Sequence, residues 1–190
     1  DHIKNYGMWT VDGEPHSLHQ DCGAEHKVLW MILATGWCGA CESYAKTVEA
    51  FYQLYHEQGL EVVWVLGSTD NHDELVTPAW AKEYAEKKNV SFTIVRDYKF
   101  GGTYGALSNF SSSLPHQYVM DSGNMELLVG TGGTVNVEPE QAVCKKLGVD
   151  WTECKQAVCD AMGKSPEQCN FDGPDPEVNN SQNGDGAPPE

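Results

Sequence analysis

Two almost uninterrupted apolar runs, Val28–Ala34 and Leu60–Leu66, stand out along the chain. Runs of this length predict strands that are covered on both faces, as in a parallel sheet. Between them, apolar side chains recur at helical spacing over residues 40–57, and Gly59 follows as a stop signal. The order of strand, helix and strand predicts a right-handed crossover and a parallel pair.

The rest of the chain predicts an α/β fold with a central mixed sheet. Alternating polarity around Asp12-Gly13 predicts an N-terminal hairpin over residues 8–18, and the turn at 121–124 predicts a second hairpin. The remaining expected elements are helices at Pro78–Lys88, 139–147 and 151–162, strands at 91–95, His116–Asp121 and 125–129, and a loop with a short helix at 101–105.

Length and composition indicate one domain with an extension. We expect a folded domain over residues 1–148, a cysteine-rich helical extension over 149–170 and an acidic tail rich in Asn, Gly and Pro over 171–190. The 190 residues carry 28 acidic and 12 basic side chains, a formal charge of −16, which would repel nucleic acid and anionic lipid alike. No apolar run approaches bilayer length, so no membrane contact is expected from this chain, although an anchor upstream of Asp1 stays compatible with it.

Seven cysteines are heavy usage for a reducing cytosol. Four of them lie close together near the C-terminus without the Cys-x-x-Cys pairs of a zinc ribbon, so structural disulfides are expected. Turns between them favour the pairs Cys144–Cys154 and Cys159–Cys169, although four cysteines permit three pairings. Cys22 is left over. This usage predicts an extracytoplasmic protein, periplasmic or secreted.

The motif Trp37-Cys38-Gly39-Ala40-Cys41 lies between the first buried strand and the long amphipathic helix. A sulfur at a helix N-terminus faces unpaired amide N–H groups and the positive end of the dipole, which favour a thiolate. Cys38 is therefore the expected nucleophile, and Cys41 the thiol that resolves a mixed disulfide. A half zinc site or a structural disulfide is the alternative, but zinc would need a second pair of ligands, so no metal is expected.

This motif, which follows an apolar strand ending in Ala34-Thr35-Gly36, resembles the active site of the thioredoxin superfamily. The resemblance covers about residues 8–147, and the N-terminal hairpin and the insert length are similar to the TlpA/ResA-like (AhpC/TSA-related) branch. It implies a thioredoxin-like three-layer fold and an extracytoplasmic thiol-disulfide oxidoreductase. The implied partners are protein thiols or disulfides and a redox partner protein. No cofactor is implied beyond the redox-active disulfide of Cys38 and Cys41.

The resemblance also implies a cis-proline beside the cysteines, and Leu114-Pro115 occupies that place, just before the strand that begins at His116. Leu114 would present its backbone to a substrate strand. His116 would lie close to Cys38, where it could stabilise a thiolate or help to bind copper. If the pleat turns it away, it is an ordinary core or surface residue, and this second interpretation is favoured.

Three departures from the family pattern affect the expected chemistry. Thioredoxins carry a buried acid where this chain has Ile32, and the TlpA/ResA-like branch carries Glu where it has Tyr44. Deprotonation of Cys41 would then need another base, such as water or Glu42, whose helical position points it to solvent. Ala40 replaces the usual proline, so the motif does not define a redox potential.

Other functions are weighed against thiol-disulfide exchange. A thioredoxin-fold module could bind copper through Cys38, Cys41 and His116, or be redox-inert and serve only for interaction. A peroxidase is ranked lowest, because Arg96 is the single arginine. The glycines at 101–105 lack the context of a phosphate-binding loop, and calcium-loop offsets at 179–190 lack flanking helices.

Overall fold

The computed structural model describes residues 2–23, 25–107, 113–134, 136–165 and 168–169. The predicted acidic tail at 171–190, with its calcium-loop offsets, therefore lies outside the described residues. The described chain forms one seven-stranded sheet in the order β2-β1-β5-β4-β3-β6-β7. Its strands are β1 (Gly7–Thr10), β2 (Pro15–Ser17), β3 (Val28–Ala34), β4 (Leu60–Leu66), β5 (Thr93–Arg96), β6 (His116–Asp121) and β7 (Glu126–Gly132).

The sheet is mixed, as the sequence predicts. Strands β3, β4 and β5 run parallel, and the hairpins β1–β2 and β6–β7 add antiparallel strands at both edges. The α-helices are α1 (Gly39–Tyr55), α2 (Pro78–Lys88), α3 (Gly101–Ala106), α4 (Glu138–Leu147) and α5 (Trp151–Ala161). Short 3₁₀ turns are present at Leu18–Asp21, His56–Gln58 and Tyr98–Phe100.

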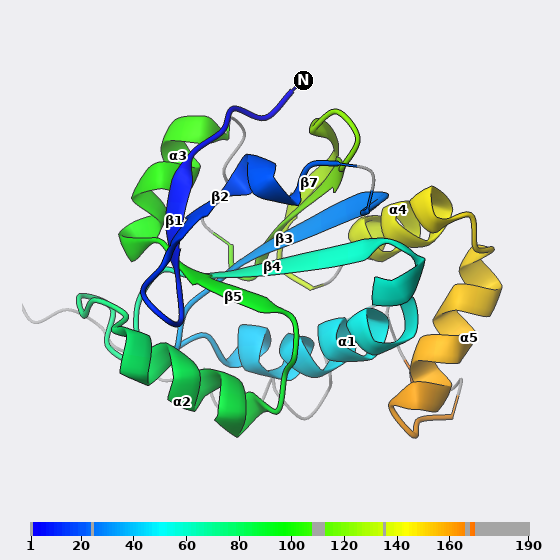
Figure 1. Cartoon of the computed structure of the whole chain (residues 1–190). Coiled ribbons are helices and arrows are strands. Elements are labelled where there is room, and N and C mark those ends of the chain that lie inside the picture. Colours follow the sequence, from blue (N-terminus) through cyan, green and yellow to red (C-terminus); the bar gives the residue numbers. More distant parts are fainter. Residues whose placement is uncertain (1, 24, 108–112, 135, 166–167, 170–190) are drawn as a thin grey trace, which may run out of the picture.

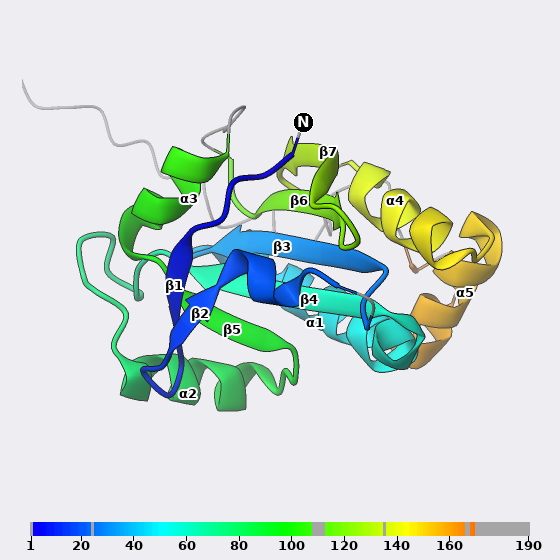
Figure 2. The same ribbon diagram turned by 45° about the horizontal axis from the view of Figure 1, so that its top comes forward.

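The helices cover the sheet on both faces, which gives the three-layer architecture (Figure 1). One core cluster joins alternate residues of β3, such as Trp30 and Ile32, to α1, α2, α4 and α5. A second cluster joins the intervening residues, such as Met31 and Leu33, to the N-terminal segment and the region of α3. Figure 2 shows α3 on the side of the sheet opposite α1 and α2. Because both faces are covered, β3 and β4 are buried along their whole length.

Most predicted elements are present with small shifts of their ends. The long helix begins at Gly39 and passes into a 3₁₀ turn after Tyr55, so the predicted span of 40–57 combines two elements. The glycines at both predicted stops, Gly59 and Gly148, take left-handed backbone conformations, which residues with a Cβ adopt only at a cost. The strand predicted at 91–95 lies at Thr93–Arg96, and the second hairpin strand extends to Gly132.

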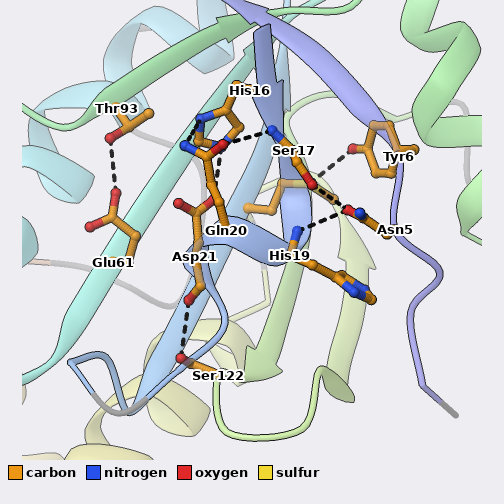
Figure 3. A network of polar contacts seen from close by, with 11 residues as sticks. Asn5, Tyr6, His16, Ser17, His19, Gln20, Asp21, Glu61, Thr93 and Ser122 are labelled. Atoms are coloured by element: carbon orange, nitrogen blue, oxygen red, sulfur yellow. Dashed lines mark hydrogen bonds and ion pairs between the residues drawn. The ribbon is translucent and has the colours of Figure 1, made fainter.

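A polar network fixes the N-terminal hairpin to the turn that leads into β3 (Figure 3). His16 is buried and contacts Asp21 through Nε2 at 2.8 Å, while its Nδ1 lies 3.0 Å from the amide nitrogen of Gln20. An amide N–H donates to Nδ1, so the proton of the neutral ring is on Nε2 and faces the carboxylate. The Asp21 carbonyl accepts a hydrogen bond from Ser122, which ties this turn to the end of β6.

The C-terminal helices form a cross-linked extension next to α1. Both favoured pairings are present: Cys144–Cys154 joins α4 to α5, and Cys159–Cys169 joins α5 to the segment after it. These sulfurs belong to the same core cluster as α1, and Figures 1 and 2 both show α5 beside α1 and α4. Cys22 is the free cysteine among the described residues.

Removing the Cys144–Cys154 disulfide should destabilise the fold without unfolding it. The bond closes a loop between residues ten apart in sequence, and the double variant Cys144→Ala/Cys154→Ala should lose about 2–3 kcal/mol of unfolding free energy. Denaturant unfolding without reductant measures this loss. The variant Cys22→Ala is the matched control and should change the free energy by less than about 1 kcal/mol. An unchanged double variant would contradict the structural role of the bond.

Candidate active site

The redox pair lies where β3 passes into α1. Cys38 has extended backbone angles and is the N-cap of α1, and its sulfur accepts a hydrogen bond from the backbone N–H of Cys41 at 3.1 Å. That N–H is one of the groups that a helix N-terminus leaves without an intrahelical partner. The sulfur of Cys38 therefore lies at the positive end of the helix dipole, as the sequence predicts.

Cys38 and Cys41 are joined as a disulfide, with their Cα atoms 5.2 Å apart. Cys38 is 7% exposed and Cys41 is fully buried. The two flanking positions of the motif, Gly39 and Ala40, are both exposed on the first turn of α1. An incoming sulfur therefore reaches Cys38 first.

Trp37, which precedes Cys38, is held by two side chains outside the motif. Its indole N–H donates to the Ser68 hydroxyl at 2.9 Å, and its ring stacks on His72 with a centroid distance of 3.9 Å. Trp37 as a residue is 40% exposed, so it offers an apolar surface next to Cys38. Gly36 makes this loop packing feasible, because a Cβ at this position would lie 2.6 Å from the backbone of Thr69.

Strand β6 brings the predicted proline to the same end of the sheet. His116 pairs with Leu33, so Pro115 falls level with the last residue of β3. The Leu114–Pro115 peptide bond is cis. Leu114 is half-buried and packs against both core clusters, and Pro115 is buried. The Pro115 carbonyl accepts a hydrogen bond from the Gly133 N–H at 2.8 Å.

His116 points to the face of the sheet opposite α1. It pairs directly with Leu33, which belongs to the second core cluster, and its ring contacts that of Tyr118 on the same face. Burial lowers the pKa of His116 to about 4, so the ring is neutral near neutral pH. This placement agrees with the favoured interpretation of His116 as a core residue, and it separates His116 from the face on which Cys41 packs.

Glu42 is exposed and forms an ion pair with Lys88 of α2. The hydrogen bond from the ammonium lowers the pKa of the carboxyl below its ordinary value. A paired carboxylate with a lowered pKa is a weak base, so Glu42 is a poor proton acceptor for Cys41.

A buried polar network lies on the side of the sheet occupied by α1. The Tyr44 hydroxyl contacts Gln117 Oε1 at 2.9 Å and also Glu140 Oε1 from α4. Gln117 Oε1 accepts a hydrogen bond from the Trp30 indole at 3.1 Å, and its amide donates to the Gly133 carbonyl at 3.0 Å. Gln117 pairs directly with residue 32 of β3, so the network adjoins the strand that leads to Cys38.

Glu140 is 2% exposed, and its Oε2 is a buried atom without a hydrogen-bond partner among the described residues. Burial raises the pKa of Glu140 to about 7, against a smaller lowering effect of the Tyr44 hydrogen bond. The pKa of Tyr44 is raised well above its ordinary value by burial and by the neighbouring carboxyl. Glu140 can thus hold or release a proton near neutral pH.

Sequence reasoning missed Glu140, Gln117 and the hydroxyl contacts of Tyr44. One signal was present: Val143, Cys144 and Leu147 recur at helical spacing, and Glu140 lies on the same stripe. An acid on the apolar face of an amphipathic helix is buried when the helix packs. Its partner Tyr44 is 96 residues away in sequence and could not be identified from the pattern.

No group of three or more metal-ligating side chains is present among the residues that the structure describes. Within the same part of the chain, no helix has the length and apolar character needed to cross a membrane. The guanidinium of Arg96 donates to the carbonyls of Thr10 and Val76, which uses it to hold loops together.

A three-layer mixed sheet with a Cys-x-x-Cys disulfide at the first turn of α1 and a cis-proline level with the end of β3 defines a thioredoxin-type redox protein. The chain belongs to the Redoxin family, whose model matches residues 3–122. The predicted membership of the thioredoxin superfamily is confirmed. A search of the curated proteins found no significant match.

Several solved structures share the fold. A putative thiol:disulfide interchange protein DsbE from Chlorobium tepidum is 19% identical with a TM-score of 0.61, covering 78% of this chain and 96% of its own. A secreted Mycobacterium tuberculosis disulfide oxidoreductase homologous to E. coli DsbE is 13% identical with a TM-score of 0.53, covering 75% and 94%. StoA from Bacillus subtilis is 17% identical with a TM-score of 0.51, covering 73% and 93%. These neighbours agree with the predicted fold.

Stability should depend on pH through Glu140. In the folded protein the Glu140 carboxyl keeps its proton up to about pH 7, whereas in the unfolded chain it releases the proton near pH 4.5. The free energy of unfolding therefore falls as the pH rises through this range. The variant Glu140→Gln removes that loss. Its stability relative to wild type should therefore rise by about 3 kcal/mol from pH 4.5 to pH 8.

Denaturant unfolding across this pH range measures the difference. Glu138→Gln removes the same charge from the exposed face of the same helix and should show no such dependence. A difference between Glu140→Gln and wild type that stays constant with pH would contradict the raised pKa.

Proposed function

We propose that the protein is a thiol-disulfide oxidoreductase that exchanges disulfides with protein substrates through Trp37-Cys38-Gly39-Ala40-Cys41 in an extracytoplasmic compartment. The observation that carries the proposal is the Cys38–Cys41 disulfide at the N-terminus of α1, with Cys38 as the N-cap. Membership of the Redoxin family supports it.

Cys38 is the nucleophile because of its position. Its sulfur is the more exposed of the pair and accepts the N–H of Cys41, a contact that favours the thiolate after reduction. Cys41 is fully buried one turn further along the helix, within bonding distance of Cys38. Attack on a substrate disulfide therefore falls to Cys38, and release of the substrate falls to Cys41.

The exchange proceeds in two balanced steps. In the first, the Cys38 thiolate attacks one sulfur of a substrate disulfide, so that a mixed disulfide forms and the second substrate sulfur leaves as a thiolate. In the second, Cys41 loses its proton and attacks Cys38, which closes the Cys38–Cys41 disulfide and releases the reduced substrate. The reverse sequence oxidises a protein dithiol and leaves the pair reduced.

The surface around Cys38 supports a protein substrate. The Trp37 ring stacks on His72 and its indole N–H donates to Ser68, so the ring is held in place while the residue stays 40% exposed. An exposed, rigid indole is typical of a contact that binds a partner with little loss of side-chain entropy. Leu114, beside the cis bond, would present its backbone to an extended substrate segment.

The structural disulfides support the extracytoplasmic location. Cys144–Cys154 and Cys159–Cys169 are bonds of a kind that forms and persists in oxidising compartments. The similar Mycobacterium tuberculosis protein is described as secreted. A redox partner protein of the same compartment would then restore the oxidation state of Cys38 and Cys41.

Substitution of the two active cysteines should have different consequences. Reduced Cys41→Ser should accumulate a covalent adduct with a protein disulfide such as insulin, because Cys38 attacks and nothing resolves the product. Cys38→Ser should form no adduct, since the remaining sulfur is buried. Both variants should lose multiple turnover. Non-reducing electrophoresis with mass spectrometry measures the adduct.

Cys22→Ser is the control, since it removes a half-buried free thiol outside the site, and its turnover should equal that of wild type. An adduct through Cys41 in the Cys38→Ser variant would overturn the assignment of the nucleophile. Absence of any exchange by the wild-type protein would overturn the proposed function.

A further inference from the structure

The hydrogen bonds of the buried network around Tyr44 determine where its protons lie. The Tyr44 hydroxyl has one proton and two oxygen neighbours, Gln117 Oε1 and Glu140 Oε1. Gln117 cannot be flipped, because its oxygen faces the Trp30 N–H and its nitrogen faces the Gly133 carbonyl. Two oxygens in hydrogen-bond contact need a proton between them, so both contacts of Tyr44 must be filled.

Only a protonated Glu140 places a proton in both hydrogen-bond contacts of the Tyr44 hydroxyl. The Tyr44 hydroxyl then donates to Gln117 Oε1, and the carboxylic acid donates to the Tyr44 oxygen. With an ionised Glu140, the single proton of Tyr44 would turn to the carboxylate, and two oxygens would be left 2.9 Å apart at Gln117 without a proton between them. The buried Oε2 of Glu140 also lacks a partner among the described residues, which disfavours a charge there. With the Cys38–Cys41 disulfide closed, Glu140 is therefore a neutral acid below its pKa of about 7.

Among the residues that the structure describes, no other charged side chain sets this state. Tyr44 of α1 is the titratable side chain that contacts Glu140, and strands β3 and β6 contribute the neutral Trp30 and Gln117. Further along α4, Lys146 is paired with Asp121. Burial raises the pKa of Glu140 to about 7, which agrees with the protonated state that the hydrogen bonds require.

Tyr44 brings the network to the face of α1 that carries Cys41. Tyr44 follows Cys41 by three residues on α1, so both project from the same face of the helix into the same core cluster. Cys41 is fully buried, and opening the disulfide creates a thiolate that water reaches poorly. A proton donor inside the core is therefore needed on this side of the disulfide.

We propose that Glu140 is a positioning residue that holds the proton exchanged by Cys41, with the Tyr44 hydroxyl as the connecting group. This inference rests on the proposed function. It names the group that accepts the proton of Cys41 when Cys41 attacks Cys38 and returns it when the disulfide opens. Among the described residues, Glu140 has no hydrogen bond to the sulfur of Cys38 or Cys41. It acts through Tyr44, which it contacts.

The proton balances over the cycle. When an external thiolate attacks Cys38, the S–S bond breaks and Cys41 leaves as a thiolate. Tyr44 passes its proton to Cys41 and takes the proton of Glu140, which leaves a Cys41 thiol and a carboxylate. In the reverse direction Cys41 gives its proton through Tyr44 to Glu140 and closes the bond to Cys38. The network returns to the neutral state that the oxidised structure requires.

The test is the rate at which dithiothreitol reduces the Cys38–Cys41 disulfide between pH 5 and 9. The ratio of a variant's rate to the wild-type rate cancels the ionisation of the reductant. The wild-type rate divided by the Glu140→Gln rate should be roughly 10- to 100-fold at pH 5 and should fall through a midpoint near pH 7, where the wild-type acid is itself ionised. Tyr44→Phe should show the same loss at low pH.

Glu138→Gln is the matched control and should keep a ratio of one at every pH. A ratio independent of pH for Glu140→Gln overturns the proposal, as does a Tyr44→Phe profile equal to that of wild type. The amide of Glu140→Gln can donate to the Tyr44 oxygen as the neutral acid does, so the fold should be kept, and circular dichroism checks this.

A measurement on the wild-type protein keeps the proposal testable if the variant fails to fold. Infrared difference spectra between the oxidised and reduced protein should show loss of one protonated carboxyl band on reduction near pH 7. No change in carboxyl bands overturns the proposal. Failure of wild type to exchange with insulin would overturn the proposed function instead, because the dithiothreitol and infrared results do not depend on a protein substrate.

Discussion

The rest of the structure depends on the burial of β3 on both faces. Alternate side chains of this strand enter the two core clusters, so neither the strand nor its register can shift without exposing one of them. The loop after Ala34 is therefore held at a fixed end of the sheet, and α1 must begin there to cover the same face. A reactive sulfur at the first turn of α1 follows from this packing, because the helix N-terminus and its free N–H groups come with it.

The same packing encloses polar groups that have to satisfy one another. Trp30 of β3 and Tyr44 of α1 both hydrogen-bond to Gln117 of β6, and Tyr44 also contacts Glu140 of α4. A buried network of this kind is stable only when every proton has a place, so its protonation state is part of the fold. The structure thereby links α4, which is distant from Cys38 in sequence, to the helix that carries the redox pair.

Much of this architecture could be predicted from the chain. The apolar runs at Val28–Ala34 and Leu60–Leu66 defined two strands because burial on both faces leaves no alternation, and a local motif placed Cys38 and Cys41 between strand and helix. The pairs Cys144–Cys154 and Cys159–Cys169 were predicted because the two cysteines of each pair are ten residues apart across a turn. Local rules are sufficient when the partners are close in sequence.

Contacts between distant residues could not be predicted in this way. The face on which His116 lies depended on the pairing of β6 with Leu33, and the partner of Tyr44 depended on how α4 crosses the sheet. The helical position of Glu42 predicted that it faces solvent, but its ion pair with Lys88 of α2 could not be predicted. In each case tertiary packing, which no local pattern describes, decided the role of a titratable side chain.

The burial of the two disulfides in the C-terminal extension has one more consequence. Cys144 and Cys154 are fully shielded from solvent, and Cys159 and Cys169 nearly so. A thiolate of another copy of the protein cannot approach these buried bonds while the chain is folded. Thiol–disulfide exchange between copies is therefore restricted to the Cys38–Cys41 pair at the first turn of α1.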